Sequence, residues 1–132
     1  MGGPIARHLG HAGHSLTLYN RSPKRIALWR EANPDIPVRE ANNAADAADG
    51  SDVVITCVGN DDDLAEVVLG PQGVFTTLHP GGLFIDHTTV SARIARQIGV
   101  EARDKEIRCV DAPMTGAQAG AEAGTLTLMC GG

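Results

Sequence analysis

The chain has 132 residues, a length that suits one domain. Hydrophobic residues make up 42% and charged residues 20%, as in ordinary globular proteins, but aromatic residues only 3%, so Ala, Val, Leu and Ile must build the core. The net charge of −5 argues against a nucleic-acid or membrane partner, because both need a basic surface.

In chain order, short apolar runs alternate with longer helix-like stretches, a rhythm that predicts a mostly parallel sheet covered by helices. Pro4 suits a first helical turn, and Ser22 before Pro23 suits a helix start. The first half is expected to contain a helix over residues 4–12, a strand over 15–19, a helix over 23–32, a short strand around Val38 and a short helix over 43–48.

The second half contains the clearest buried strand, the continuous β-branched run over residues 53–58. Residues 112–124 are rich in Gly and Ala and predict an irregular segment. The other expected elements are a helix over 61–69, a loop or short helical turn over 70–78, a strand over 83–86, a helix over 91–103 with Ile94, Ile98 and Ala102 inward, and strands over 107–111 and 125–130.

The cysteines Cys57, Cys109 and Cys130 are widely spaced and form no C-x-x-C pair, which argues against zinc. Because Cys57 and Cys109 lie in apolar runs, we interpret them as buried, reduced thiols of a cytoplasmic protein. His8 and His11 share a predicted helix, but no third ligand is evident, so they are interpreted as surface residues and no metal is expected.

A doubly wound nucleotide-binding domain begins with a buried strand, a Gly-rich turn and a helix, whereas this sequence begins at the turn, with Met1-Gly2-Gly3-Pro4. Either the fold is different or the sequence is a fragment. In the common strand order 3-2-1-4-5-6, the absent strand would lie between residues 15–19 and 53–58. Two unpaired interior edges would then make the free chain unstable or prone to aggregate.

Ordered sequence blocks carry a resemblance to a known family. They are M-G-G-P-I-A-R-H-L-G-H-A-G-H from Met1, Y-N-R-S-P-K from Tyr19, D-V-V-I-T-C-V from Asp52, F-I-D-H-T-T-V-S from Phe84 and, most diagnostic, D-A-P-M-T-G-A-Q-A-G-A-E-A-G-T-L-T-L-M-C-G-G from Asp111. The chain resembles the amino-terminal domain of β-hydroxyacid dehydrogenases, which is similar to that of 6-phosphogluconate dehydrogenase. The resemblance implies one Rossmann-like α/β domain over residues 1–132, doubly wound, with a mostly parallel sheet.

The chain departs from the family pattern in several respects. The first strand and the first two glycines of G-x-G-x-x-G have no counterpart. Met114, Thr115 and Ala117 replace Val, Ser and Gly, and Val58-Gly59 replaces Leu-Pro. The family's all-helical carboxyl-terminal domain and its catalytic lysine also have no counterpart, so we expect no catalytic residue in this chain and no activity from the chain alone.

The resemblance implies cofactor contacts near the strand ends. Gly2 and Gly3 are expected to face the dinucleotide pyrophosphate at a helix N-terminus, where N–H groups are free; a frayed terminus is the alternative. Val58, Gly59 and Asp63 match positions on the adenosine side, although Asp63 could instead serve only the helix dipole.

Asn20, Arg21 and Ser22 form the turn where an acidic residue would bind the ribose of NAD and repel a 2′-phosphate. With Lys24 nearby, this turn predicts NADP as the cofactor, and NAD is the second choice. The alternative is that the turn is simply exposed to solvent and binds no cofactor. Thr89 matches a hydroxyl near the nicotinamide ribose; its rival role is helix capping, for which Ser91 is better placed.

Thr115, Gly116 and Ala117 match the family's substrate-anchoring S-G-G, which offers a hydroxyl and backbone N–H groups to a carboxylate. Unlike glycine, Ala117 disfavours a positive φ. The alternative to a substrate-binding role is that the segment only connects two elements. His87 replaces a Ser or Cys of the family near the cofactor and receives no catalytic role.

The resemblance predicts an NADP-dependent oxidoreductase that passes a hydride between nicotinamide and a small carboxylate substrate, a β-hydroxyacid such as 3-hydroxyisobutyrate or its semialdehyde. When complete, the protein is expected to be a homo-oligomer. The rivals are an enzyme for a sugar-acid phosphate, as in 6-phosphogluconate dehydrogenases, and a nucleotide-sensing or scaffolding relative without catalysis.

Overall fold

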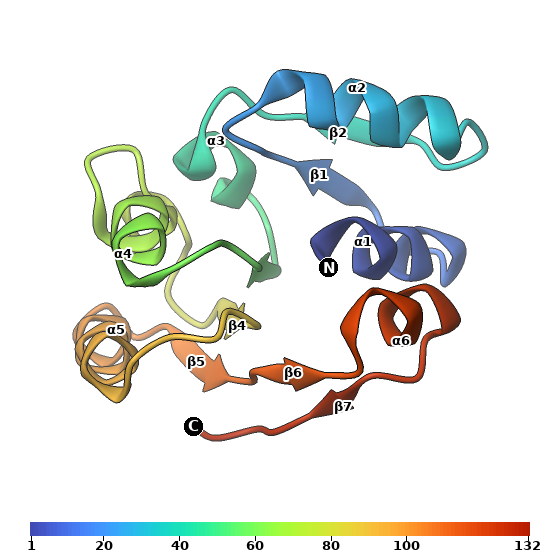
Figure 1. Ribbon diagram of the computed structural model, residues 1–132. Coiled ribbons are helices and arrows are strands. Elements are labelled where there is room, and N and C mark those ends of the chain that lie inside the picture. Colours follow the sequence, from blue (N-terminus) through green and yellow to red (C-terminus); the bar gives the residue numbers. More distant parts are fainter.

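The computed structural model describes residues 1–132, with helices and strands in alternation along most of the chain (Figure 1). The helices are α1 (Gly2–His11), α2 (Pro23–Ala32), α3 (Ala44–Ala48), α4 (Asp61–Leu69), the 3-10 helix η1 (Val74–Thr76), α5 (Ala92–Asp104) and α6 (Ala117–Ala123). The strands are β1 (Leu16–Leu18), β2 (Val38–Glu40), β3 (Val53–Thr56), β4 (Leu83–Asp86), β5 (Arg108–Asp111), β6 (Met114–Thr115) and β7 (Thr127–Leu128).

The strands form three separate sheets. β1 pairs with β2 in parallel, β3, β4 and β5 form a parallel sheet in that order, and β6 pairs with β7 in antiparallel fashion. No strand pairs between β1 and β3, which is the place that the common order gives to an opening strand. The predicted Rossmann-like architecture and the predicted break in its sheet are both confirmed.

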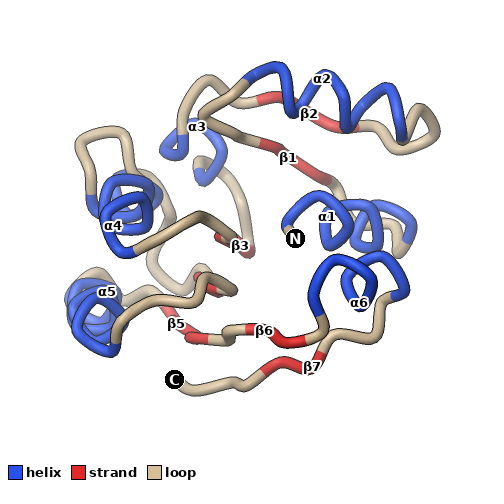
Figure 2. The backbone as a smooth tube through the Cα atoms, in the orientation of Figure 1, coloured by secondary structure: helices blue, strands red, loops and turns tan.

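The hydrophobic core lies where α3, α4, η1 and α5 pack on β4. Phe84 of β4 is fully buried, and its ring meets that of Phe75 edge to face with centroids 5.2 Å apart. Figures 1 and 2 show α4 and α5 together on one side and α1 beside α6 on the other. The predicted inward face of α5 is confirmed, since its buried residues are Ile94, Ile98 and Ala102.

The half built from α1, β1 and β2 has a thinner core, because neither α1 nor β1 contains a buried residue. The strand predicted over residues 53–58 is present as β3, but the prediction that it is buried was wrong. β3 ends at Thr56, its only buried residue, and Val53 is 46% exposed. The physical reason is the open edge of β3, which no neighbouring strand covers.

Residues 112–124 are more ordered than their Gly and Ala content predicts, because they contain β6 and α6. Gly116, at φ 128°, is the N-cap residue of α6, and Gly124, at φ 70°, ends the helix in the left-handed conformation. Alanine is the best helix former, and its helix preference outweighs the effect of the glycines because α6 packs against α1. β7 spans only part of the predicted residues 125–130.

Several other boundaries follow local chemistry. The predicted ranges of α2, α4 and β4 are confirmed, whereas α1 begins at Gly2 rather than Pro4. The Asn60 side chain caps α4 by accepting from the Asp63 N–H at 2.9 Å, and Ser22 holds the N-cap position of α2 without a side-chain bond. None of the helices combines the length and the apolar character that crossing a membrane requires.

Candidate functional site

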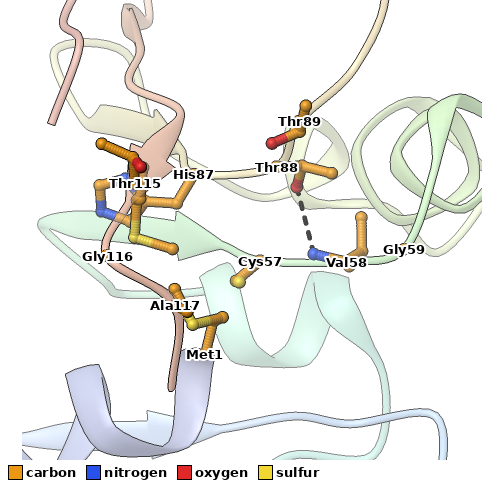
Figure 3. A pocket seen from close by; sticks show the side chains of 11 residues that line it. Met1, Cys57, Val58, Gly59, His87, Thr88, Thr89, Thr115, Gly116 and Ala117 are labelled. Atoms are coloured by element: carbon orange, nitrogen blue, oxygen red, sulfur yellow. Dashed lines mark hydrogen bonds between the residues drawn. The ribbon is translucent and has the colours of Figure 1, made fainter. Parts of the chain in front are cut away.

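A cavity of about 360 Å³ opens at the carboxyl ends of β3, β4 and β5. Parallel strands end on the same edge of a sheet, so the loops that follow them meet there. The volume falls within the range of small-molecule sites. The lining residues, drawn in Figure 3, are Met1, Cys57, Val58, Gly59, His87, Thr88, Thr89, Met114, Thr115, Gly116 and Ala117.

A buried carboxylate joins the loops after β3 and β4. Asp86 is 5% exposed, and its Oδ1 accepts from the Thr56 hydroxyl at 2.7 Å and from the Thr88 N–H at 3.0 Å. The Thr88 hydroxyl accepts in turn from the Val58 N–H at 3.1 Å (Figure 3). Because no fully buried side-chain polar atom lacks a partner, this network holds one wall of the cavity in a fixed shape.

No lysine, arginine, aspartate or glutamate lines the cavity, but the lining residue Met1 carries the positively charged α-amino group of the chain. Burial raises the pKa of the Cys57 thiol, which therefore stays protonated at neutral pH and is a poor nucleophile. Cys57 and Cys109 are half-buried rather than buried, Cys130 is exposed, and all are free thiols. The polar side chains that the lining offers to a ligand are those of Thr88, Thr89, Thr115 and His87.

The structure separates the two glycines at the start of α1. Gly2 lies against the loop after β3, where an added Cβ would stand 3.5 Å from the Cys57 Cβ. The Gly3 carbonyl accepts from the Trp29 indole N–H at 2.8 Å, and an added Cβ would lie 3.3 Å from that ring. Gly2 therefore lies beside the cavity wall, whereas Gly3 serves the close packing of α1 against α2.

The turn after β1 is joined to α4 by an ion pair. The Arg21 Nη1 lies 3.0 Å from the Asp63 Oδ1, and 79% of the Arg21 side chain is exposed. An added Cβ on Gly59 would come within 2.9 Å of the Asp63 Oδ2, so a side chain there would displace the carboxylate. Arg21, Asp63 and the cavity-lining Gly59 thus form one continuous surface.

The remaining residues of this turn are exposed. The Asn20 Oδ1 accepts from the Ser22 N–H at 2.9 Å, a bond that shapes the turn. Lys24, in the first turn of α2, takes part in no ion pair. None of the three lines the cavity.

The segment Thr115–Ala117 forms the opposite wall of the cavity and leads into α6. This helix is fastened to α1, since the His8 Nε2 donates to the carbonyl oxygens of Ala121 and Glu122 at 3.0 and 3.1 Å. Arg7 adds a bond of 2.8 Å to the Glu122 carbonyl. These contacts join the end of α6 to the second half of α1, and so fix the helix into which the segment leads.

Among the residues proposed from the sequence, those that line the cavity are Val58, Gly59, Thr89, Thr115, Gly116 and Ala117. The N-cap of α5 is Ser91, which removes the capping role considered for Thr89. Sequence reasoning gave no role to Met1, Cys57, His87, Thr88 or Met114. The signal was available, because all but Met1 lie within three residues of the end of a predicted strand.

The alternating α/β order, with a cavity at the carboxyl ends of parallel strands, defines a dinucleotide-binding domain. The family model described as the NAD-binding domain of 6-phosphogluconate dehydrogenase matches residues 1–132. The chain belongs to this family of nicotinamide-dinucleotide-binding domains, which it shares with the β-hydroxyacid dehydrogenases.

Individual relatives agree with this family. An uncharacterised oxidoreductase of Shewanella frigidimarina (strain NCIMB 400) is 47% identical over the whole chain, which covers 44% of that protein. A probable mitochondrial 3-hydroxyisobutyrate dehydrogenase-like protein of Arabidopsis thaliana is 38% identical, with 100% of the chain and 43% of that protein covered. The structure of Mycobacterium tuberculosis 3-hydroxyisobutyrate dehydrogenase with L-serine matches with a TM-score of 0.87 at 30% identity, over 100% of the chain and 43% of that structure. The chain spans less than half the length of these relatives.

Proposed function

We propose that the complete protein is an NADP-dependent dehydrogenase of small β-hydroxyacids, in which this domain binds the cofactor and one side of the substrate. The observation that carries the proposal is the cavity of about 360 Å³ between two unlike walls. One wall is the loop pair held by Thr88 and Val58, and the other is the segment Thr115–Ala117. The first suits a nicotinamide ring and its ribose, and the second suits a small acid.

The residues at the site fit such a cofactor. Gly2 leaves room beside the loop after β3, and Gly59 keeps the surface open between the cavity and Arg21. The Thr89 hydroxyl belongs to the wall proposed for the nicotinamide ribose. When bound, the nicotinamide supplies or accepts the hydride, while the protein binds, orients and excludes water.

The preference for NADP rests on Arg21. An exposed ion pair contributes only about 0–1 kcal/mol, so little is lost when the Arg21 guanidinium turns from Asp63 to a ligand phosphate. A phosphate group offers a guanidinium stronger, charge-assisted bonds. Lys24 adds a positive charge at the same turn, and no carboxylate follows β1 directly.

The substrate class rests on the neutral wall around Thr115. A hydroxyl and backbone N–H groups bind a carboxylate without a cationic partner. L-serine, present in the Mycobacterium structure, is itself a β-hydroxyacid. Because the lining contains no lysine, the proposal assigns the hydroxyl proton to a group in the remainder of the protein. A homo-oligomeric assembly and a cytoplasmic location belong to the same proposal, the latter supported by the free thiols.

The test is steady-state oxidation of 3-hydroxyisobutyrate by the complete protein with NADP and with NAD, for the wild type and Arg21→Ala. We expect the wild type to have a higher kcat/KM with NADP than with NAD. Arg21→Ala should lower kcat/KM about tenfold or more with NADP but change it little with NAD. Arg25→Ala, an exposed arginine on the next turn, is the matched control. Absence of turnover with both nucleotides, for 3-hydroxyisobutyrate and for L-serine alike, contradicts the enzyme assignment, and a wild type that favours NAD contradicts the role of Arg21.

A further inference from the structure

His87 is a buried imidazole in the cavity wall that the proposed chemistry leaves unused. The residue is 8% exposed, and its backbone N–H donates to the Thr56 carbonyl at 2.9 Å. Its ring Nδ1 lies 2.7 Å from the Ala112 carbonyl oxygen. Because a carbonyl only accepts, Nδ1 carries the hydrogen, and the ring is held in one tautomer and one orientation.

The second ring nitrogen is open to the cavity. Nε2 of His87 has no hydrogen-bond partner in the protein, and no polar side-chain atom of the chain is both fully enclosed and unpartnered. Nε2 is therefore accessible from outside the protein, in a residue whose side chain lines the cavity. With the ring hydrogen on Nδ1, where the Ala112 carbonyl accepts it, Nε2 carries the lone pair and is a hydrogen-bond acceptor.

The position of the ring narrows the choice of ligand. In Figure 3 the ring lies on the Thr115 side of the cavity, and Val58 and Gly59 lie on the other side. An acceptor on the substrate side does not bind a carboxylate oxygen, which also only accepts. It matches an O–H or N–H group of the bound acid.

We propose that His87 Nε2 accepts a hydrogen bond from a second donor group of the substrate, carried beside the hydroxyl that is oxidised. His87 is thus a specificity-determining residue, and the inference rests on the proposed function. A β-hydroxyacid with an α-hydroxyl or α-amino group satisfies Nε2, whereas an α-methyl group leaves a nearly buried acceptor unpaired. Sites built for a hydrogen bond reject analogues that lack the donor.

The experiment compares glycerate with 3-hydroxyisobutyrate in the complete protein, because the two acids differ at the α-carbon in a hydroxyl against a methyl. His87→Asn keeps a donor for the Ala112 carbonyl but removes the acceptor from the cavity. His87→Gln places an amide oxygen near the position of Nε2. We expect the ratio of kcat/KM for glycerate to that for 3-hydroxyisobutyrate to fall about tenfold in His87→Asn and to recover in large part in His87→Gln.

Equal losses for both acids in His87→Asn, or no recovery in His87→Gln with an unchanged melting temperature, overturn the inference. A readout independent of turnover is the ¹⁵N resonance of the His87 imidazole in the NADP complex. Glycerate should shift the Nε2 signal and 3-hydroxyisobutyrate should not, and an unmoved signal at saturating glycerate also overturns the inference. If neither acid is oxidised but glycerate shifts Nε2, the proposed reaction fails while the assignment of His87 stands.

Discussion

Gly116 and Ala117 follow each other with positive φ, at 128° and 52°. Glycine adopts such a conformation without cost, but an alanine in the left-handed region is destabilised by about 1–2 kcal/mol. The family that the sequence resembles has a glycine at position 117. In this chain the position is an alanine that still adopts a positive φ. The backbone at the proposed substrate wall is strained at Ala117, and the contacts of α6 with α1 keep it so.

Replacing Ala117 with glycine should therefore stabilise the protein by about 1 kcal/mol, since the relieved strain exceeds the backbone entropy that glycine adds. The measurement is denaturant unfolding of the complete protein. Ala119→Gly, an exposed position inside α6, is the matched control and should cost about 1 kcal/mol. Equal destabilisation by the two substitutions would show that Ala117 is not strained.

Neighbouring strands place two acidic residues side by side. Asp86 ends β4 and Asp111 ends β5, and the parallel register sets them opposite each other. Burial, and next the charge of Asp86, raise the pKa of Asp111 above its ordinary value. Between the ordinary and the raised pKa, the folded state binds more protons than the unfolded state. The contribution of Asp111 to stability is therefore present below its ordinary pKa and is lost as pH rises through the folded-state pKa.

Asp111→Asn should accordingly raise the melting temperature at pH 7 and have little effect at pH values below the ordinary pKa of 3.8. Thermal melts of the complete protein across this range give the comparison. Asp104→Asn, at the exposed end of α5, serves as the control. A gain of the same size at every pH would show that charge and burial at Asp111 do not determine the effect.

Elements with strong local signals were predictable from the sequence. The spacing of Ile94, Ile98 and Ala102 predicts the buried face of α5, and Ser22-Pro23 predicts the start of α2. α6 was not predictable, because its glycines obscure the helix preference of its alanines until α1 provides a surface. His87 and Thr88 follow a predicted strand, which indicates the edge of the sheet, but their bonds to Ala112 and Val58 depend on which loops meet there, and the sequence pattern does not record this.

At the scale of the molecule, the sheet is divided between β1 and β3, and the fully buried core lies almost wholly on the β3–β5 side. The proposed site spans the division. Arg21 belongs to the first half, all cavity-lining residues except Met1 belong to the second, and the Arg21–Asp63 pair joins the two halves. The instability expected of the isolated chain stays a prediction, and its physical basis is the two open strand edges.

Hydrogen–deuterium exchange of the complete protein with and without saturating NADPH tests most directly whether these segments form one cofactor site. Exchange should slow at the start of α1, in the turn around Arg21, and in the loops containing Val58–Gly59 and Thr88–Thr89, but remain unchanged at the exposed end of α2. No slowing under saturating NADPH, or slowing confined to segments away from the carboxyl ends of β3 and β4, would contradict the proposed site.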